Sequence, residues 1–243
     1  MIEQELDIRT ADGVMNTFVT HPEEGGPFPV VLFYMDAPGK REELHDMARR
    51  IATVGYYVVL PNLYYRKTRE FQFVRDEEGF KRMFALMEHL SNDLVMRDTQ
   101  AMLDFVDSRK EAKASAVGAV GYCMSGPFTF AAAARFPERV KCAASIYGVR
   151  LATDSEDSPH LQAHKVRGEL YFGCAETDKY VPKEMIDKLE AHLKSIPGLR
   201  SRIEWYMGVE HGFAFPQREG IFHKPSAERH WERLFALFKR NLT

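Results

Sequence analysis

The chain has 243 residues, of which 45% are hydrophobic, and this length and composition suffice for one large core. Lysine and arginine total 33 against 35 aspartate and glutamate residues, so the formal net charge is −2 and no basic field is present to hold nucleic acid. The N-terminus lacks a cationic and apolar signal segment, and no apolar run reaches membrane-spanning length. We therefore expect a cytoplasmic protein without nucleic-acid or membrane partners.

The first 80 residues contain the signals of a hairpin followed by a parallel unit. Alternating runs at 5–9 and 14–19 flank Ala11-Asp12-Gly13, a pattern typical of a β-hairpin. Next come an apolar run, a segment with helical spacing and a second apolar run, which together predict a parallel βαβ unit over 29–61. The segment 62–80 is irregular, aromatic and charged, and we expect it to pass over one end of the sheet.

The remaining chain alternates between helix-like and strand-like segments, with no internal repeat or linker. We predict helices over 81–90, 94–107, 183–195 and 226–241 and strands over 117–120, 142–147, 169–172 and 201–206. This alternation predicts an α/β fold, a mostly parallel doubly wound sheet with helices on both faces, in a single domain over residues 1–243.

The chain has three cysteines, and their sequence contexts predict different roles. None forms a C-x-x-C pair, which argues against a disulfide framework and a structural zinc site and fits a reducing compartment. Cys142 and Cys174 lie in or beside apolar strand-like runs and are interpreted as packing residues. Cys123 differs because it stands in Gly121-Tyr122-Cys123-Met124-Ser125-Gly126, between a buried strand and a helix.

A nucleophile between a strand and a helix, flanked by small residues, is typical of the nucleophile elbow of α/β-hydrolases, here with cysteine instead of serine. The tight turn needs small neighbours and aims the side chain out of the sheet, while the N–H of the next residue, Met124, points to where an oxyanion forms. The pattern therefore predicts covalent catalysis by Cys123. The alternative that Cys123 is a packing residue has lower weight in this context.

A cysteine nucleophile needs a base, and the base needs a third group to orient it. In α/β-hydrolases the acid and then the histidine follow the nucleophile, on loops after later strands. Asp178 and His211 fall in such loops, and we expect them to be the acid and the base. Glu176 and Glu210 lie in the same loops and are interpreted as solvated carboxylates.

Once this order is recognised, the chain resembles the dienelactone hydrolase (carboxymethylenebutenolidase) family. The resemblance covers most of the chain and rests on the strand at 30–34 with Asp36, the segment 55–64, Gly121-Tyr122-Cys123, Asp178-Lys179-Tyr180-Val181-Pro182 and His211-Gly212-Phe213. It implies an α/β-hydrolase fold and a Cys-His-Asp triad, with no metal or organic cofactor. It also implies a small-molecule ester or lactone as the substrate, and we expect a monomer or homodimer.

Three positions depart from the family pattern. Ser125-Gly126 stands where the family commonly has two glycines, and serine is small enough to preserve the elbow. Asp36 stands where the family usually has a glutamate that pairs with the cysteine, so Asp36 is expected in that role with a shorter reach. Phe215 lies where the family places an arginine that grips the substrate carboxylate, which predicts a preference for neutral acyl groups. Arg66, Arg75, Arg82 or Arg218 are the candidates for a replacement grip.

These assignments predict a carboxylic ester or lactone hydrolase with an acyl-enzyme intermediate. The N–H groups of Met124 and Ala37 are expected to bind the oxyanion. Four aromatic residues are expected to line the substrate pocket, with plain core packing as the alternative for each: Tyr64, Tyr65, Phe213 and Phe215. The alternative function is a non-hydrolytic ligand-binding or thiol-based redox-sensing protein on the same scaffold.

Overall fold

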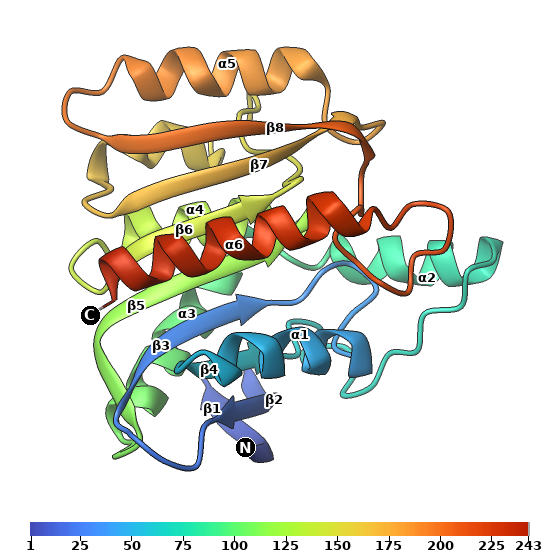
Figure 1. The fold of residues 1–243 in the computed structure, drawn as a ribbon. Coiled ribbons are helices and arrows are strands. Elements are labelled where there is room, and N and C mark those ends of the chain that lie inside the picture. Colours follow the sequence, from blue (N-terminus) through green and yellow to red (C-terminus); the bar gives the residue numbers. More distant parts are fainter. Residues whose placement is uncertain (243) are drawn as a thin grey trace.

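The computed structural model describes residues 1–242, and its strands form one eight-stranded sheet in the order β1-β2-β4-β3-β5-β6-β7-β8 (Figure 1). β1 and β2 are antiparallel, β2 is antiparallel to β4, and the strands from β4 to β8 are mutually parallel. The strands are β1 (Ile2–Thr10), β2 (Gly13–His21), β3 (Phe28–Tyr34), β4 (Tyr57–Pro61), β5 (Ala112–Tyr122), β6 (Val140–Ile146), β7 (Glu169–Thr177) and β8 (Arg200–Glu210).

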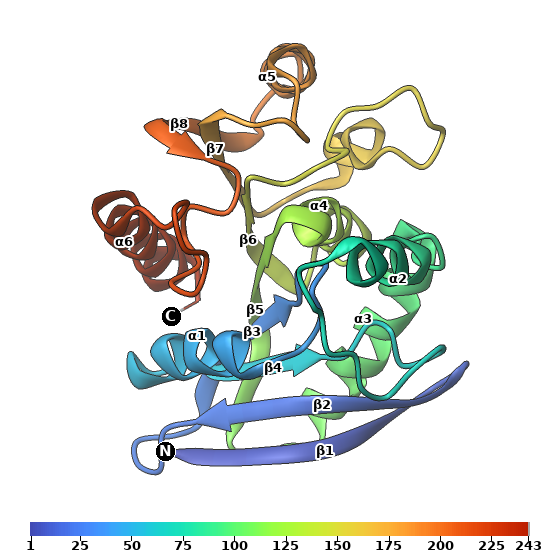
Figure 2. The ribbon, with the colours of Figure 1, turned by 90° about the vertical axis from the view of Figure 1, so that its right-hand side faces the viewer.

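The helices cover both faces of this sheet. Figure 2 shows α1 and α6 on one face and α3 and α4 on the other, with α5 beyond β7 and β8. No helix among residues 1–242 has the length and apolar character needed to cross a membrane. The helices are α1 (Glu42–Thr53), α2 (Glu77–Met87), α3 (Asn92–Asp107), α4 (Gly126–Arg135), α5 (Lys183–Lys194) and α6 (Lys224–Asn241), with 3₁₀ turns η1 (Cys123–Ser125) and η2 (Pro159–Lys165).

The predicted hairpin and parallel unit are confirmed. Thr10 pairs with Gly13 at the end of the β1–β2 ladder, so the hairpin turns at the two residues between them. β3 and β4 lie parallel, with α1 as the connection. The α/β fold expected from the alternation of elements is therefore confirmed.

The main differences from the predicted elements are at their ends. β7 and β8 run to Thr177 and Glu210, several residues beyond the predicted strands, because they pair with each other up to Thr177 and Glu210. α2 begins at Glu77, earlier than expected, because the Asp76 side chain accepts a hydrogen bond from the N–H of Gly79 at 2.7 Å and caps the helix.

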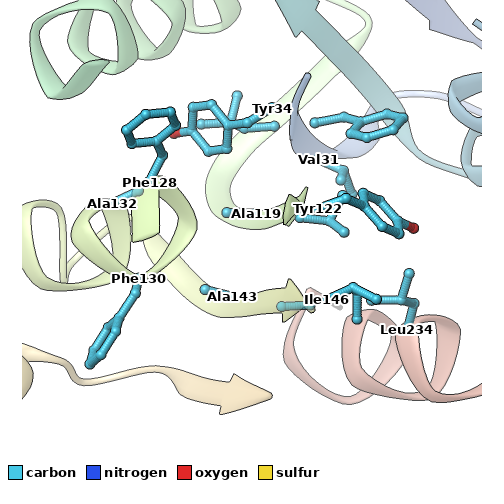
Figure 3. Packing of buried hydrophobic residues seen from close by; sticks show 14 of the residues in the cluster. Val31, Tyr34, Ala119, Tyr122, Phe128, Phe130, Ala132, Ala143, Ile146 and Leu234 are labelled. Carbon is cyan, nitrogen blue, oxygen red and sulfur yellow. The ribbon is translucent and has the colours of Figure 1, made fainter. Parts of the chain in front are cut away.

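The core lies between the sheet and the helices on each face. Figure 3 shows Val31, Tyr122 and Ile146, from three neighbouring strands, gathered toward Leu234 of α6. Phe128 and Phe130 extend from α4 on the opposite face, and all these side chains are buried. Burying such apolar area from several central strands holds the carboxyl ends of these strands in fixed positions.

The contact between α4 and the segment after β6 is unusually close. A Cβ added at Gly126 would lie 2.4 Å from Cα of Gly148 and 2.5 Å from Oγ of Ser145. Because real Cβ atoms do not approach other atoms so closely, this approach requires glycine at position 126.

Replacing Gly126 with alanine should therefore destabilise the fold by about 3 kcal/mol, the upper part of the usual cost of overpacking. Urea unfolding monitored by circular dichroism measures this loss. Gly198→Ala is the matched control, since its φ is +76° but an added Cβ meets nothing within 4 Å. The control should lose only about 1 kcal/mol from its backbone conformation. Equal, small losses for both variants would contradict the proposed steric requirement.

Candidate active site

Cys123 stands at the turn between β5 and α4. Its φ is 54°, in the left-handed region that few non-glycine residues adopt, and α4 begins three residues later. The carbonyl of Cys123 accepts a hydrogen bond from the N–H of Val149 at 3.1 Å. The side chain is half-buried and lines a large cleft. The local geometry is thus a strand–turn–helix elbow with a strained residue at its tip.

Ser125, the hydroxyl residue of this turn, has a structural role. It is fully buried, and its hydroxyl donates a hydrogen bond to the carbonyl oxygen of Met35, at the end of β3. A Cβ added at Gly121 would lie 2.8 Å from Cβ of Ser125. Ser125 therefore fills the narrow space behind the elbow and ties it to the neighbouring strand.

Asp178 and His211 lie at the ends of adjacent parallel strands, directly after β7 and β8. His211 Nδ1 and Asp178 Oδ2 are 2.7 Å apart, and both side chains are at least 95% buried. The rings of Tyr147 and Tyr180 each lie 4.9 Å from the His211 ring, between centroids. This arrangement fixes the imidazole plane and leaves Nε2, which is buried without a hydrogen-bond partner of good geometry among residues 1–242, available to Cys123.

The His211 ring has a strongly altered proton affinity. Burial lowers its pKa, but the hydrogen bond with Asp178 and the interaction with the Cys123 thiol outweigh burial and raise the pKa to about 9. The imidazolium is thus the favoured form at neutral pH. A proton that the thiol gives up to this ring therefore stays on it.

Ala37 and Met124, the predicted oxyanion donors, are linked through one tyrosine. The hydroxyl of Tyr64 donates to the carbonyl of Ala37 at 2.8 Å and lies 3.4 Å from Sδ of Met124. Tyr64 is 2% exposed, so it supports both residues from behind.

Asp36 pairs with two arginines. Arg41 Nη1 lies 2.5 Å from Asp36 Oδ1, and Arg218 Nη2 lies 3.1 Å from Asp36 Oδ2. Arg41 also contacts Glu43 at 2.6 Å, and Glu43 accepts from the N–H of Gln217. Both Asp36 oxygens are thus bound to arginines, so the expected pairing of Asp36 with Cys123 is not the arrangement in this structure.

The cleft that contains Cys123 and His211 has a volume of about 1880 Å³. Ala37, Arg41 and Arg218 line it near the cysteine. The prediction that Tyr64, Tyr65, Phe213 and Phe215 line the pocket is wrong, because all four are at most 8% exposed and none lines the cleft. They pack in the core, and the Tyr65 hydroxyl bonds to Asp98 at 2.8 Å.

The four candidate arginines separate into two groups. Arg75 and Arg218 line the cleft. Arg66 is bound to Asp98 and Asp12, and Arg82 lies over the Phe71 ring beside a second, smaller hollow. No sequence pattern predicted the role of Arg41, because its buried partner, Asp36, was expected to pair with Cys123.

The raised pKa of His211 predicts a pH-dependent stability. A pKa of about 9, above the ordinary 6.5, means that proton binding stabilises the fold fully below pH 6.5, and this contribution is lost as pH rises toward 9. The loss should reach roughly 3 kcal/mol, measured by urea unfolding at pH 6, 7.5 and 9. His211→Asn should remove this component, whereas His89→Asn, at an exposed histidine, should behave as the wild type. Parallel profiles for wild type and His211→Asn would contradict the assignment.

Known proteins resemble this chain over most of its length. The model of the family described as "Dienelactone hydrolase family" matches residues 15–242. A "Putative carboxymethylenebutenolidase" of Synechocystis sp. is 25% identical over 228 residues, covering 93% of this chain and 91% of that protein.

Solved structures share the fold. A Klebsiella pneumoniae protein titled "Putative Dienelactone Hydrolase" superposes with a TM-score of 0.86 at 23% identity, over 98% of both chains. A dienelactone hydrolase from Anabaena variabilis gives 0.70 at 18% identity, over 100% of this chain and 99% of that one. The chain belongs to the dienelactone hydrolase family, and it is a hydrolase for ester or lactone substrates.

Proposed function

We propose that the protein hydrolyses carboxylic esters or lactones through a Cys123-His211-Asp178 triad and an acyl-enzyme intermediate. The observation that carries this proposal is the 2.7 Å contact between the buried Asp178 and His211, which lines the same cleft as the strained elbow residue Cys123. A non-catalytic thiol module has no need of a buried carboxylate that orients a histidine.

The proposed reaction has two acyl transfers. Sγ of Cys123, whose proton is held by His211 as the imidazolium, bonds to the acyl carbon, and the N–H groups of Met124 and Ala37 bind the resulting oxyanion. The C–O bond then breaks, and the leaving alkoxide takes the proton from His211. In the second step water gives a proton to the neutral His211 and attacks the thioester, and Sγ leaves as the thiolate beside the imidazolium. The free acid is the product.

Cys123 should be the only cysteine whose modification stops ester hydrolysis. Cys142 and Cys174 are buried, and burial raises the pKa of both thiols, to about 12 for Cys174, so neither is a good nucleophile. Iodoacetamide followed by peptide mass spectrometry should find label at Cys123 in proportion to the activity lost. Inactivation with label only on Cys142 or Cys174 would overturn the assignment.

Replacement of each proposed triad residue tests its role in catalysis against a control variant. Cys123→Ala, His211→Ala and Asp178→Asn should each lower kcat by about 10³-fold or more. Glu176→Gln is the control from the end of β7, two residues before Asp178, since its carboxylate bonds to the N–H of Gly208 at 2.6 Å and does not line the cleft. This control should retain most activity, and an Asp178→Asn enzyme as active as the control would exclude Asp178 as the orienting acid.

The charges near Cys123 support a preference for neutral substrates. Two arginines, Arg41 and Arg218, are matched by two carboxylates, Asp36 and Glu43, so the group has no net charge to offer to a substrate carboxylate. Burying an unpaired carboxylate there costs several kcal/mol, about a hundredfold or more in kcat/KM.

p-Nitrophenyl butyrate should accordingly be hydrolysed with a higher kcat/KM than the carboxylate-bearing cis-dienelactone. Asp36→Asn removes one of the two carboxylates, so this variant should move the ratio toward the dienelactone. A wild-type preference for the dienelactone would refute the charge argument and indicate that Arg218 or Arg75 grips the substrate.

A further inference from the structure

Part of the lining of the cleft is apolar. Helix α2 lies beyond the carboxyl ends of the parallel strands, away from the sheet (Figure 1). Phe80, Met83, Phe84 and Met87 of this helix line the same cleft as Cys123 and His211. These four residues have the spacing i, i+3, i+4, i+7, which places them on one face of the helix. We call this face the α2 stripe.

The stripe continues into the segment before the helix. Phe71, Phe73 and Val74 line the cleft beside it. The rings of Phe73 and Phe80 meet edge to face at 5.1 Å between centroids, and those of Phe80 and Phe84 are stacked at 6.3 Å. The aromatic side chains thus form a continuous surface rather than isolated exposed residues.

An apolar stripe on a helix normally packs against the core, and here it does so only in part. Of the eleven residues of α2, only Gly79 and Met83 are buried, and Phe84 is 46% exposed. Because exposed apolar area in one patch is costly in water, such a surface indicates a binding site. Because the stripe and Cys123 line the same cleft, a group bound to Cys123 can reach the stripe.

The volume of the cleft favours a large substrate over a small one. Ordinary small-molecule pockets measure about 300–1,000 Å³, and this cleft measures about 1880 Å³. A small lactone attached to Cys123 leaves the α2 stripe uncovered. A long or bulky apolar group on the cysteine can extend along the cleft and cover the stripe.

On the basis of the function proposed above, we infer that the α2 stripe binds the acyl group of the substrate and that the enzyme acts on neutral esters or lactones with a large apolar acyl chain. Linear alkyl and aryl-alkyl chains share the required chemistry. The stripe is then a specificity element, separate from the groups that perform the acyl transfer.

The test is the dependence of kcat/KM on acyl length, with p-nitrophenyl acetate, butyrate, octanoate and 4-phenylbutyrate. Each buried methylene adds about 0.8 kcal/mol of binding, so octanoate should exceed butyrate by about tenfold or more in the wild type. A double variant, Phe80→Ala with Phe84→Ala, should reduce this ratio about tenfold. The phenylbutyrate arm distinguishes an aryl preference from an alkyl one.

Leu86→Ala is the matched control. Leu86 lies on α2 but lines the second hollow instead of the cleft, so its replacement loosens the same helix without touching the stripe. The control should keep both the octanoate-to-butyrate ratio and the butyrate rate of the wild type. A fall in the ratio equal to that of the double variant would overturn the inference, because helix loosening would then explain it.

A binding measurement separates this inference from the proposed chemistry. Cys123→Ala enzyme, titrated calorimetrically with methyl octanoate and methyl butyrate, should bind the octanoate about tenfold more tightly, and the α2 double replacement in that background should abolish the difference. Chain-length-dependent binding without turnover in the wild type would refute only the proposed function. Turnover and binding that are both independent of length would refute only the α2 inference. A gain for octyl acetate but not for octanoate esters would overturn the assignment to the acyl side.

Discussion

The backbone turn at Cys123 is the constraint on which the rest of the site depends. A left-handed conformation at a residue with a side chain costs about 1–2 kcal/mol, so surrounding contacts must hold it. Those contacts come from the segments after two neighbouring strands: Ser125 bonds to Met35 after β3, and after β6 the N–H of Val149 donates to the Cys123 carbonyl and Gly148 closes against Gly126. The same turn therefore fixes the elbow relative to the end of β3, where Ala37 follows. A single strained residue thus sets the positions of the proposed nucleophile and both oxyanion donors.

The paired charges beside the turn explain why its polar surroundings stay ordered. Asp36 is fully buried, and removing one partner of a buried ion pair costs more than the pair itself contributes. Burial lowers the pKa of Arg41, but its carboxylate partners Asp36 and Glu43 more than reverse this effect, so Arg41 stays charged. The network joins the end of β3 and the start of α1 to Arg218, in the loop after β8 that carries His211. Its two arginines are matched by its two carboxylates, so the network itself adds no net charge to this part of the cleft.

Local patterns in the sequence predicted most of what positions the site. Alternation gave the hairpin, the apolar runs gave the parallel strands, and the chain order placed Asp178 and His211 after adjacent strands, where their side chains meet at 2.7 Å. Contacts between distant segments had no such signal. Arg218 meets Asp36 across 182 positions, and Phe215, expected in the pocket, is instead buried beneath Arg218, whose guanidinium lies 4.7 Å from its ring centroid. Periodicity shows which residues are apolar, but not whether they face the core or a cleft, and so the aromatic pocket was assigned to the wrong residues.

The two sides of the cleft meet different physical requirements. Acyl transfer needs groups held to within a fraction of an ångström. The elbow and the proposed oxyanion donors follow the central strands β5 and β3, and the histidine follows β8 at the edge of the sheet, where it is closely packed. Recognition of an apolar chain needs only area removed from water, which a marginally buried helix supplies without precise geometry. Since only Gly79 and Met83 of α2 are buried, we expect changes to the exposed part of its stripe to alter which acyl group is held while leaving the turn at Cys123 intact. In the proposed mode of binding, one rigid reaction centre thus serves substrates whose size is decided by α2.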